Sequence, residues 1–263
     1  MNARGGHFLK QDLGAFDASF FSISPTEAKS MDPQQRLLLE TVYEAMESGG
    51  MTLEDVANTM TSCYVGCFSH DYYDMGDRDA EIAPIHSSTG NSSSILSNRI
   101  SYFYNLKGPS LTMDTACSSG LIAMHLACQS LRAGESKQAV VGATNLMFMP
   151  DVFSTMSNLH FLSPDSICYS YDDRANGYAR GEAVTALILK PLEDAIRDND
   201  SIRAVVRSSA CNQDGRTFGI TQPSPDAQQE LIRAAYRDAG LEFDQTDYFE
   251  AHGTGTQAGD PIE

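Results

Sequence analysis

One cysteine lies in a setting that suits a nucleophile. The residues Asp114-Thr-Ala-Cys117-Ser-Ser-Gly120 follow a short apolar run and precede a long helical pattern, so Cys117 is predicted at a turn from a strand into a helix. Unpaired N–H groups and the dipole at a helix N-terminus favour a thiolate, and the same N–H groups can hold an oxyanion. The residues alone leave two interpretations open. One is a nucleophile elbow with sulfur as the attacking atom, and the other is a buried, inert cysteine.

A histidine in a loop rich in glycine and threonine is the second candidate. Glu250-Ala-His252-Gly-Thr-Gly-Thr256 follows a predicted strand, and ligand sites of α/β proteins gather at the carboxyl ends of strands. Gly253 and Gly255 would let the backbone approach a ligand, and Thr254 and Thr256 offer hydroxyls to amide groups. Two alternatives stay open: a turn that merely needs glycine, and a phosphate loop. The phosphate loop fits less well, because the glycine spacing is not G-x-G-x-x-G and no P-loop lysine follows.

The remaining cysteines carry no comparable signal. Cys128 lies inside the helical pattern that follows Cys117 and is expected in the core. Cys63 and Cys67 are spaced CxxxC, but no second Cys/His pair follows at zinc spacing, so no structural metal is expected. Six cysteines in 263 residues are too sparse for a disulfide scaffold, which predicts reduced thiols in a cytoplasmic protein.

Composition and charge exclude several classes of partner. The chain has 18 Lys and Arg against 35 Asp and Glu, a net charge of −17, so neither nucleic acid nor an anionic membrane is expected as a partner. No run approaches the about 18 apolar residues of a membrane span, and the first residues lack the pattern of a signal peptide. Hydrophobic residues make up 41 %, which is typical of a globular protein with a sizeable core.

Strand and helix patterns alternate along the chain, which predicts an α/β fold with a largely parallel sheet. Asp32 and Pro33 begin a helix in which Gln35 completes a capping box, and Gly49 and Gly50 end it. The helix 118–133 is apolar on more than one face and is therefore expected to be buried. The other predicted elements are an extended stretch at 16–23, strands at 63–68, 111–113, 139–143, 183–189, 202–210 and 248–251, and helices at 87–98, 191–197 and 224–238.

Taken together, the cysteine and histidine motifs resemble the β-ketoacyl synthase domain of type I polyketide synthases. The resemblance covers the whole chain, and the opening residues 2–9 (NARGGHFL) are most similar to the fungal, highly reducing subgroup. Further blocks agree in the same order, namely 16–25 (FDASFFSISP), 31–40 (MDPQQRLLLE), 97–102 (SNRISY), 108–110 (GPS), 173–178 (DRANGY) and 259–263 (GDPIE).

The resemblance implies a thiolase-like fold, layered αβαβα, with two similar halves and usually a homodimer. Residues 1–210 would form the N-terminal half without its front edge, and residues 211–263 the beginning of the C-terminal half. Cys117 matches the acyl-accepting nucleophile and His252 the first of two catalytic histidines. Thr254 and Thr256 match positions that bind the pantetheine arm of the carrier protein.

The implied activity is acyl transfer followed by decarboxylative Claisen condensation with a malonyl thioester. Both substrates would arrive on the phosphopantetheine arm of an acyl carrier protein, and no metal, nicotinamide or other directly bound cofactor is expected. The family's second histidine and its lysine have no counterpart here, so the chain is expected to be an internal fragment that is inactive by itself. Two further hypotheses are a thiol hydrolase, which would need an orienting Asn or Asp that no motif supplies, and a non-catalytic piece of poor solubility.

Overall fold

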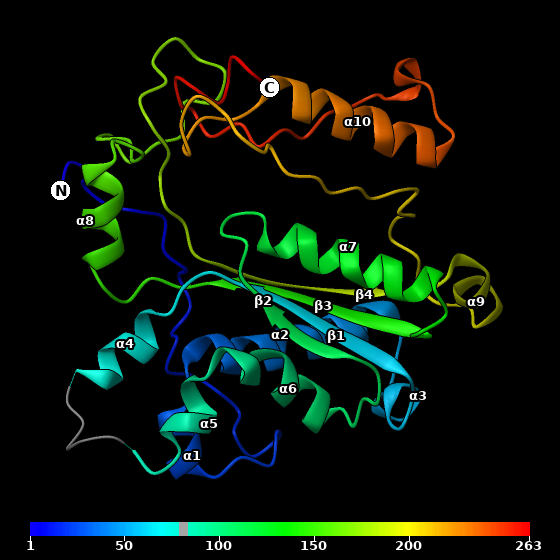
Figure 1. The fold of residues 1–263 in the computed structure, drawn as a ribbon. Coiled ribbons are helices and arrows are strands. Elements are labelled where there is room, and N and C mark those ends of the chain that lie inside the picture. Colours follow the sequence, from blue (N-terminus) through cyan, green and yellow to red (C-terminus); the bar gives the residue numbers. More distant parts are fainter. Residues whose placement is uncertain (79–83) are drawn as a thin grey trace. The chain divides into compact units, whose positions relative to one another are not determined.

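The computed structural model describes residues 1–78 and 84–263 (Figure 1). These residues form two compact units, each assembled from separate stretches of the chain. The sheet unit comprises Leu9–Phe148 and Glu182–Val205, and the loop unit comprises Met1–Phe8, Met149–Gly181 and Val206–Glu263. Among the described residues, no helix has both the length and the apolar character needed to span a bilayer.

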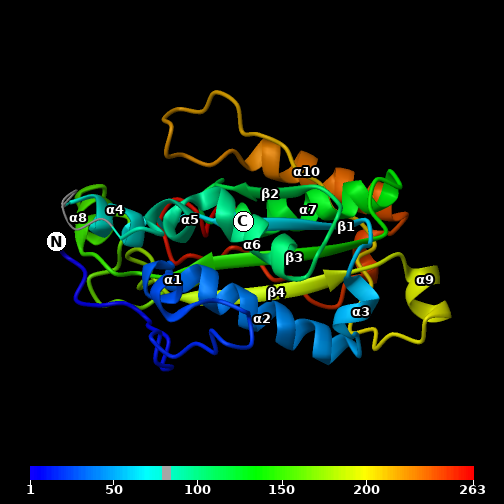
Figure 2. The ribbon, with the colours of Figure 1, turned by 90° about the horizontal axis from the view of Figure 1, so that it is seen from below.

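The sheet unit is built on four strands in the order β2-β1-β3-β4 (Figure 2). β1 (Thr61–Cys67) pairs in parallel with β2 (Ser110–Met113) and with β3 (Gln138–Asn145), while β4 (Ala183–Leu189) runs antiparallel to β3. Every residue of β1 is buried, as expected for a strand that has neighbours on both sides and helices on both faces. The prediction of a largely parallel sheet is confirmed.

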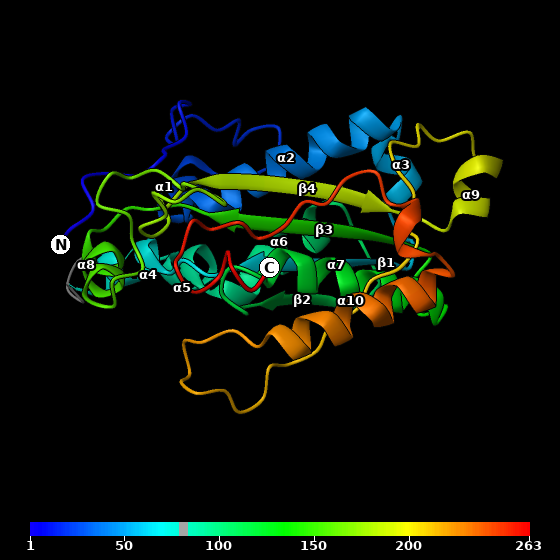
Figure 3. The ribbon, with the colours of Figure 1, turned by 90° about the horizontal axis from the view of Figure 1, so that it is seen from above.

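Helices cover both faces of this sheet. α2 (Pro33–Gly49) and α6 (Ser93–Phe103) pack on one face (Figure 1), and α7 (Ser119–Arg132) packs on β1 and β3 from the other, the face seen in Figure 3. The shorter helices of the unit are α1 (Pro25–Ser30), α3 (Leu53–Val56), α4 (Asp71–Asp77), α5 (Ser87–Asn91) and α9 (Leu192–Arg197).

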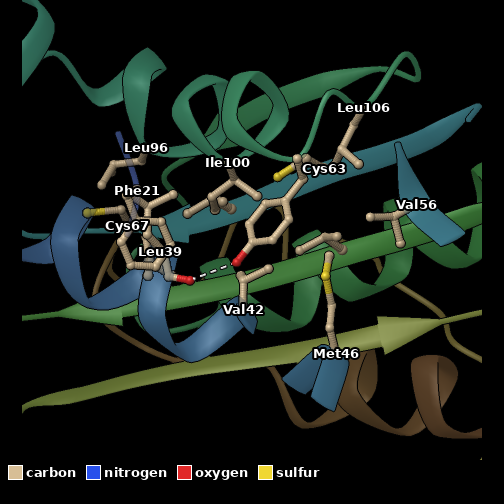
Figure 4. Close-up of a cluster of buried hydrophobic side chains, with 14 of the residues drawn as sticks. Phe21, Leu39, Val42, Met46, Val56, Cys63, Cys67, Leu96, Ile100 and Leu106 are labelled. Atoms are coloured by element: carbon tan, nitrogen blue, oxygen red, sulfur yellow. Dashed lines mark hydrogen bonds between the residues drawn. The ribbon is translucent and has the colours of Figure 1, made fainter. Parts of the chain in front are cut away.

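The main core lies between β1 and the helices α2 and α6 (Figure 4). Val42 and Met46 of α2 and Ile100 of α6 are at most 1 % exposed. Tyr104 follows α6 and is 2 % exposed, and its hydroxyl donates a hydrogen bond of 3.0 Å to the carbonyl of Leu39. The ring therefore contributes apolar area to the core while its polar atom keeps a partner.

Helix α2 begins and ends where the sequence predicts, but the prediction of a capping box at its N-terminus is wrong. Asp32 accepts the N–H of Gln34 at 2.8 Å, and Gly50 ends the helix with φ 77°. The backbone N–H of Asp32 donates to the carbonyl of Gly90 at 2.9 Å, and the Gln35 amide donates to that same carbonyl at 2.8 Å. Gln35 thus joins α2 to the segment 89–90, because a tertiary partner replaces the local one.

Two further expectations for the sheet unit are corrected. Residues 18–22 form turns, so the segment 16–23 is not an extended stretch, although Phe21 packs into the core at 5 % exposure as expected. Helix α7 is not buried all round, since Leu121 is 68 % exposed and Leu126 is 37 % exposed. Its small residues, such as Ala123 and Ala127, face the sheet instead.

The loop unit contains α8 (Asp151–Asn158), α10 (Pro225–Ala239) and the short 3₁₀ helix η2 (Phe243–Gln245). α10 agrees with its prediction, because the Ser224 hydroxyl caps the N–H of Ala227 and Gly240 ends the helix with φ 64°. The predicted strands at 202–210 and 248–251 are wrong, since neither segment pairs with a strand in the part of the chain that the structure describes. Apolar, β-branched residues favour a strand, but a strand also needs a neighbour to accept its hydrogen bonds.

Candidate active site

Cys117 lies in the turn between the end of β2 at Met113 and the start of α7 at Ser119, and it is exposed. The alternative of a buried cysteine at this junction is therefore wrong. The position matches the elbow geometry predicted from the sequence: a strand, a tight turn that carries the thiol, and a helix whose N-terminus begins two residues later.

Side chains of the turn hold its backbone. Ala116 has a left-handed φ of 56°, and its N–H donates to a carboxylate oxygen of Asp114 at 2.8 Å. The Ser119 hydroxyl accepts the N–H of Thr115 at 2.8 Å and donates to the carbonyl of Ala116 at 2.6 Å. The Ser118 hydroxyl donates to the carbonyl of Thr115 at 2.8 Å. The turn that carries the thiol is thus fixed by three side chains next to it in sequence.

Two glycines let the first turn of α7 lie directly against the sheet. A Cβ placed on Gly66 of β1 would lie 2.5 Å from the carbonyl carbon of Ser119 and 2.6 Å from the nitrogen of Gly120. A Cβ on Gly120 would lie 3.0 Å from the Cβ of Ala143 in β3. The buried strands therefore set the height of the helix N-terminus, and with it the height of Cys117, above the sheet.

The other thiols fall into two groups. Cys63, Cys67 and Cys128 are buried, as expected for Cys128, and burial raises the pKa of both Cys63 and Cys67 to about 12. Cys168 and Cys211 are exposed like Cys117. Exposure alone therefore does not single out Cys117; its place at the N-terminus of a long helix does.

His252 is exposed and lies in the loop unit. The glycines that follow it have positive φ angles, 52° at Gly253 and 74° at Gly255. A Cβ on Gly255 would lie 2.8 Å from the nitrogen of Tyr169, and the carbonyl of Gly255 accepts the N–H of Gly177 at 3.0 Å. The loop that carries His252 thus packs closely against residues 169–177.

Two carboxylates from the end of the chain fix this loop. Asp260 accepts the N–H of Gly255 at 3.0 Å and the N–H of Tyr171 at 2.6 Å. Glu263 accepts the N–H of Gly253 at 2.8 Å and the hydroxyl of Tyr171 at 2.7 Å, and this hydroxyl bond raises the pKa of Tyr171 to about 12. A phosphate would need the same glycine N–H groups, so the phosphate-loop alternative is not supported.

The roles of Asp260 and Glu263 were not visible in the sequence, which marked them only as part of a block similar to the ketosynthase family. The position of two acidic residues shortly after a glycine-rich loop could have predicted this role, because the N–H groups of such a loop need acceptors. Their partner Tyr171 lies about 80 positions earlier in the chain than the loop, and no local pattern links the two.

Thr254 and Thr256 lie next to each other in the loop. Their hydroxyl oxygens are 3.1 Å apart, and Thr256 Oγ1 also accepts the N–H of Gly259 at 3.0 Å. Both residues are half-buried. The structure brings both threonines together with His252 in one loop, while Cys117 belongs to the sheet unit, so its meeting with the loop residues stays a prediction.

No group of three or more His, Cys, Asp or Glu side chains is arranged to hold a metal ion among the residues that the structure describes.

Family models match almost the whole chain. Residues 1–195 match the β-ketoacyl synthase N-terminal domain, and residues 203–263 match the β-ketoacyl synthase C-terminal domain. The chain therefore belongs to the β-ketoacyl synthase family. Its fold is similar to that of the ketosynthase from module 6 of the bacillaene synthase from Bacillus subtilis 168, with a TM-score of 0.90 and 41 % identity over 97 % of this chain and 43 % of that one. An oxazolomycin ketosynthase domain from Streptomyces albus gives a TM-score of 0.91 and 38 % identity over 96 % of this chain and 44 % of that one. The α/β, thiolase-like fold class is thereby confirmed.

Similar curated proteins are fungal polyketide synthases. The highly reducing polyketide synthase Preu1 of Preussia isomera is 56 % identical over the whole of this chain and 11 % of its own length. The lovastatin diketide synthase mokB of Monascus pilosus is 58 % identical over the whole of this chain and 10 % of its own length. The chain thus spans about a tenth of the length of these relatives, and its resemblance to the highly reducing subgroup is confirmed.

Proposed function

We propose that this chain supplies the nucleophile and the first histidine of a condensing ketosynthase in polyketide biosynthesis. The observation that carries the proposal is the exposed Cys117 thiol at the N-terminus of α7, in a turn held by side-chain hydrogen bonds. The chain that presents this thiol belongs to the ketosynthase family. The reaction class is acyl transfer followed by decarboxylative carbon–carbon bond formation, the chemistry of a 3-oxoacyl-carrier-protein synthase.

In the first half-reaction, the Cys117 thiolate attacks the carbonyl carbon of an acyl thioester carried on the pantetheine arm. The negative charge moves onto the carbonyl oxygen, and it then returns to expel the pantetheine thiolate, which takes up a proton. The product is an acyl-Cys117 thioester. Covalent attachment divides one difficult condensation into two easier steps, and backbone N–H groups at the start of α7 suit the transient oxyanion.

In the second half-reaction, a malonyl thioester loses carbon dioxide and the bonding electrons form an enolate. The enolate carbon attacks the acyl-Cys117 carbonyl, a carbon–carbon bond forms, and the Cys117 thiolate leaves. His252 donates a hydrogen bond to the enolate oxygen from a neutral imidazole, and one such donor is worth about 3–4 kcal/mol. Release of carbon dioxide drives the step, and the β-ketoacyl product stays on the carrier.

The pantetheine arm enters as part of the substrate. Thr254 and Thr256 fit such an arm, because their adjacent hydroxyls can pair with its amide groups. The partners of the proposal are an acyl carrier protein and a second copy of the ketosynthase, in the cytoplasm. The division of the chain at residues 210 and 211 into an N-terminal and a C-terminal half is part of the same proposal.

Acyl labelling tests the nucleophile. The full-length protein that carries these residues is incubated with a short acyl thioester, and the adduct is mapped by mass spectrometry. Cys117 is expected to be acylated, while Cys168 and Cys211 serve as internal controls because they are exposed as well. Acylation spread over the three thiols in proportion to exposure contradicts the assignment.

A histidine replacement tests the second half-reaction. His252→Ala is expected to leave acylation of Cys117 intact and to lower condensation about a hundredfold or more, the usual effect of losing one oxyanion donor. His7→Ala is the control, since His7 is an exposed histidine of the same unit. Condensation that survives in His252→Ala removes His252 from the mechanism.

A further inference from the structure

The Ser119 hydroxyl bridges the two ends of the dipeptide that precedes Cys117. It accepts the N–H of Thr115 at 2.8 Å and donates to the carbonyl of Ala116 at 2.6 Å. We propose that Ser119 is a positioning residue that holds the Cys117 thiol in its attacking geometry. This inference rests on the proposed role of Cys117 as the acyl acceptor.

The bridged dipeptide contains a strained residue. Ala116 has φ 56°, a left-handed conformation that costs a residue with a Cβ about 1–2 kcal/mol. Side chains hold both ends of this residue, because Asp114 accepts its N–H at 2.8 Å and Ser119 binds its carbonyl. Without the Ser119 hydroxyl, the carbonyl of Ala116 keeps only the longer bond of 3.1 Å from the backbone N–H of Ser119, and the N–H of Thr115 loses its acceptor, so the dipeptide is less well held against relaxation toward a negative φ. Such a rotation moves the next residue, which is Cys117.

Ser119 acts through the turn and makes no contact with the substrate. Its side chain is buried at 4 % exposure, and both hydrogen-bonding functions of its hydroxyl are used within the turn. Its backbone lies against Gly66 of β1, so the bridge ties Thr115 and Ala116 to the buried strand. Ser118 is half-buried, and its hydroxyl bonds to the carbonyl and the hydroxyl of Thr115, so it holds Thr115 instead of Ala116.

The consequence of the bridge is kinetic. A nucleophile has to sit within about 3–3.5 Å of the carbonyl carbon and in line with its orbital, and a displacement of about 1 Å costs up to a hundredfold in rate. The serine forms no bond to the substrate and transfers no proton. Its effect therefore falls on the rate of acyl transfer to Cys117 and not on substrate affinity.

A matched pair of variants separates this role from general stabilisation. Ser119→Ala is compared with Ser130→Ala in the full-length protein. Ser130 is also 4 % exposed and also lies on α7, and its hydroxyl bonds to Glu135 at 3.0 Å and to Ser136 at 2.7 Å. Both variants lose a buried hydroxyl with two partners, so both are expected to unfold at a lower urea concentration by a similar amount.

The readouts are kcat and KM for acyl transfer to Cys117 and the rate of its alkylation by iodoacetamide across the pH range of the thiol. Ser119→Ala is expected to lower kcat and the plateau alkylation rate about tenfold with KM unchanged, as two lost hydrogen bonds suggest. Ser130→Ala is expected to leave both rates as in the wild type. Ala116→Gly, added to Ser119→Ala, is expected to restore most of the loss, because glycine adopts a positive φ without strain.

Wild-type rates in Ser119→Ala, an equal fall in Ser130→Ala, or no restoration by Ala116→Gly would each overturn the inference. Failure of Cys117 to become acylated in the wild-type protein overturns the proposed function instead, so the two failures are distinguishable.

Discussion

The contact between β1 and the start of α7 predicts that Gly66→Ala disables the nucleophile without unfolding the protein. The added Cβ would lie 2.5 Å from the carbonyl carbon of Ser119. That carbon belongs to the helix backbone, so no side-chain rotation relieves the overlap. To reach ordinary contact at 3.4 Å, α7 has to move away from β1 by about 0.9 Å.

Two magnitudes follow from this displacement. Overpacking of a buried site costs about 1–3 kcal/mol of the free energy of unfolding, which a domain of ordinary stability tolerates. A shift of about 1 Å at a reacting atom lowers the rate about a hundredfold. The rate of acyl transfer to Cys117 is therefore expected to fall far more than the stability.

Gly142→Ala is the matched control for this experiment. Gly142 lies in β3 and pairs with Val65, the neighbour of Gly66. A Cβ there would meet side-chain ends, with Leu38 Cδ2 at 3.0 Å and Val65 Cγ2 at 3.3 Å, so it overpacks the α2 face of the same sheet without touching α7. The assay measures acyl transfer by mass spectrometry and stability by urea unfolding. A wild-type rate in Gly66→Ala, or an equal loss of rate in Gly142→Ala, refutes the reasoning.

Titration of the native protein with a thiol reagent, followed by mapping of the labelled peptides, is expected to modify three cysteines and to spare the buried ones up to about pH 9. Burial raises the pKa of Cys63 and Cys67 to about 12, so these thiols stay protonated there. Labelling of a buried thiol in the folded protein contradicts the structure. The expected set is Cys117, Cys168 and Cys211 against Cys63, Cys67 and Cys128. Asp260→Asn removes the negative charge from the group that accepts the N–H of Tyr171 and the N–H of Gly255. The condensation rate is therefore expected to fall about tenfold or more while acylation of Cys117 continues. An equal loss of acylation contradicts the prediction that this loop serves condensation alone. Arg99→Lys is expected to lower the free energy of unfolding by about 1–3 kcal/mol, because three guanidinium nitrogens bind three different acceptors and an ammonium group cannot bind all three. Urea unfolding measures this free energy. An unchanged unfolding midpoint shows that the three hydrogen bonds of the guanidinium group contribute nothing to stability.

Local chemistry was enough to predict the boundaries of α2 and α10, but not those of the helix expected at 87–98, which is divided at Ser92 into α5 and a longer α6 that ends at Phe103. Asp32 and Gly50 limit α2, and Ser224 and Gly240 limit α10, because capping serves N–H and C=O groups within a few residues of each cap. The same local logic placed Cys117 at the start of α7.

Long-range partners explain what the sequence patterns missed. Gln35 has the spacing of a capping box, yet its amide donates to Gly90, which lies 55 positions away in the chain. The segments 202–210 and 248–251 have strand-like composition but pair with no strand in the described residues. A strand is defined by its neighbour, and composition alone does not supply one.

The order of residue types along the chain was sufficient to identify the ketosynthase family and to predict the candidate nucleophile Cys117 and the histidine loop with its two threonines, because these motifs depend on spacing and on neighbours in sequence. The fold decided what holds them in place. Gly66 meets Ser119 only when β1 and α7 pack together, and Asp260 reaches Tyr171 only when two loops about 90 positions apart lie side by side. Such contacts form only when packing brings distant segments of the chain together, so no local pattern in the amino-acid sequence predicts them.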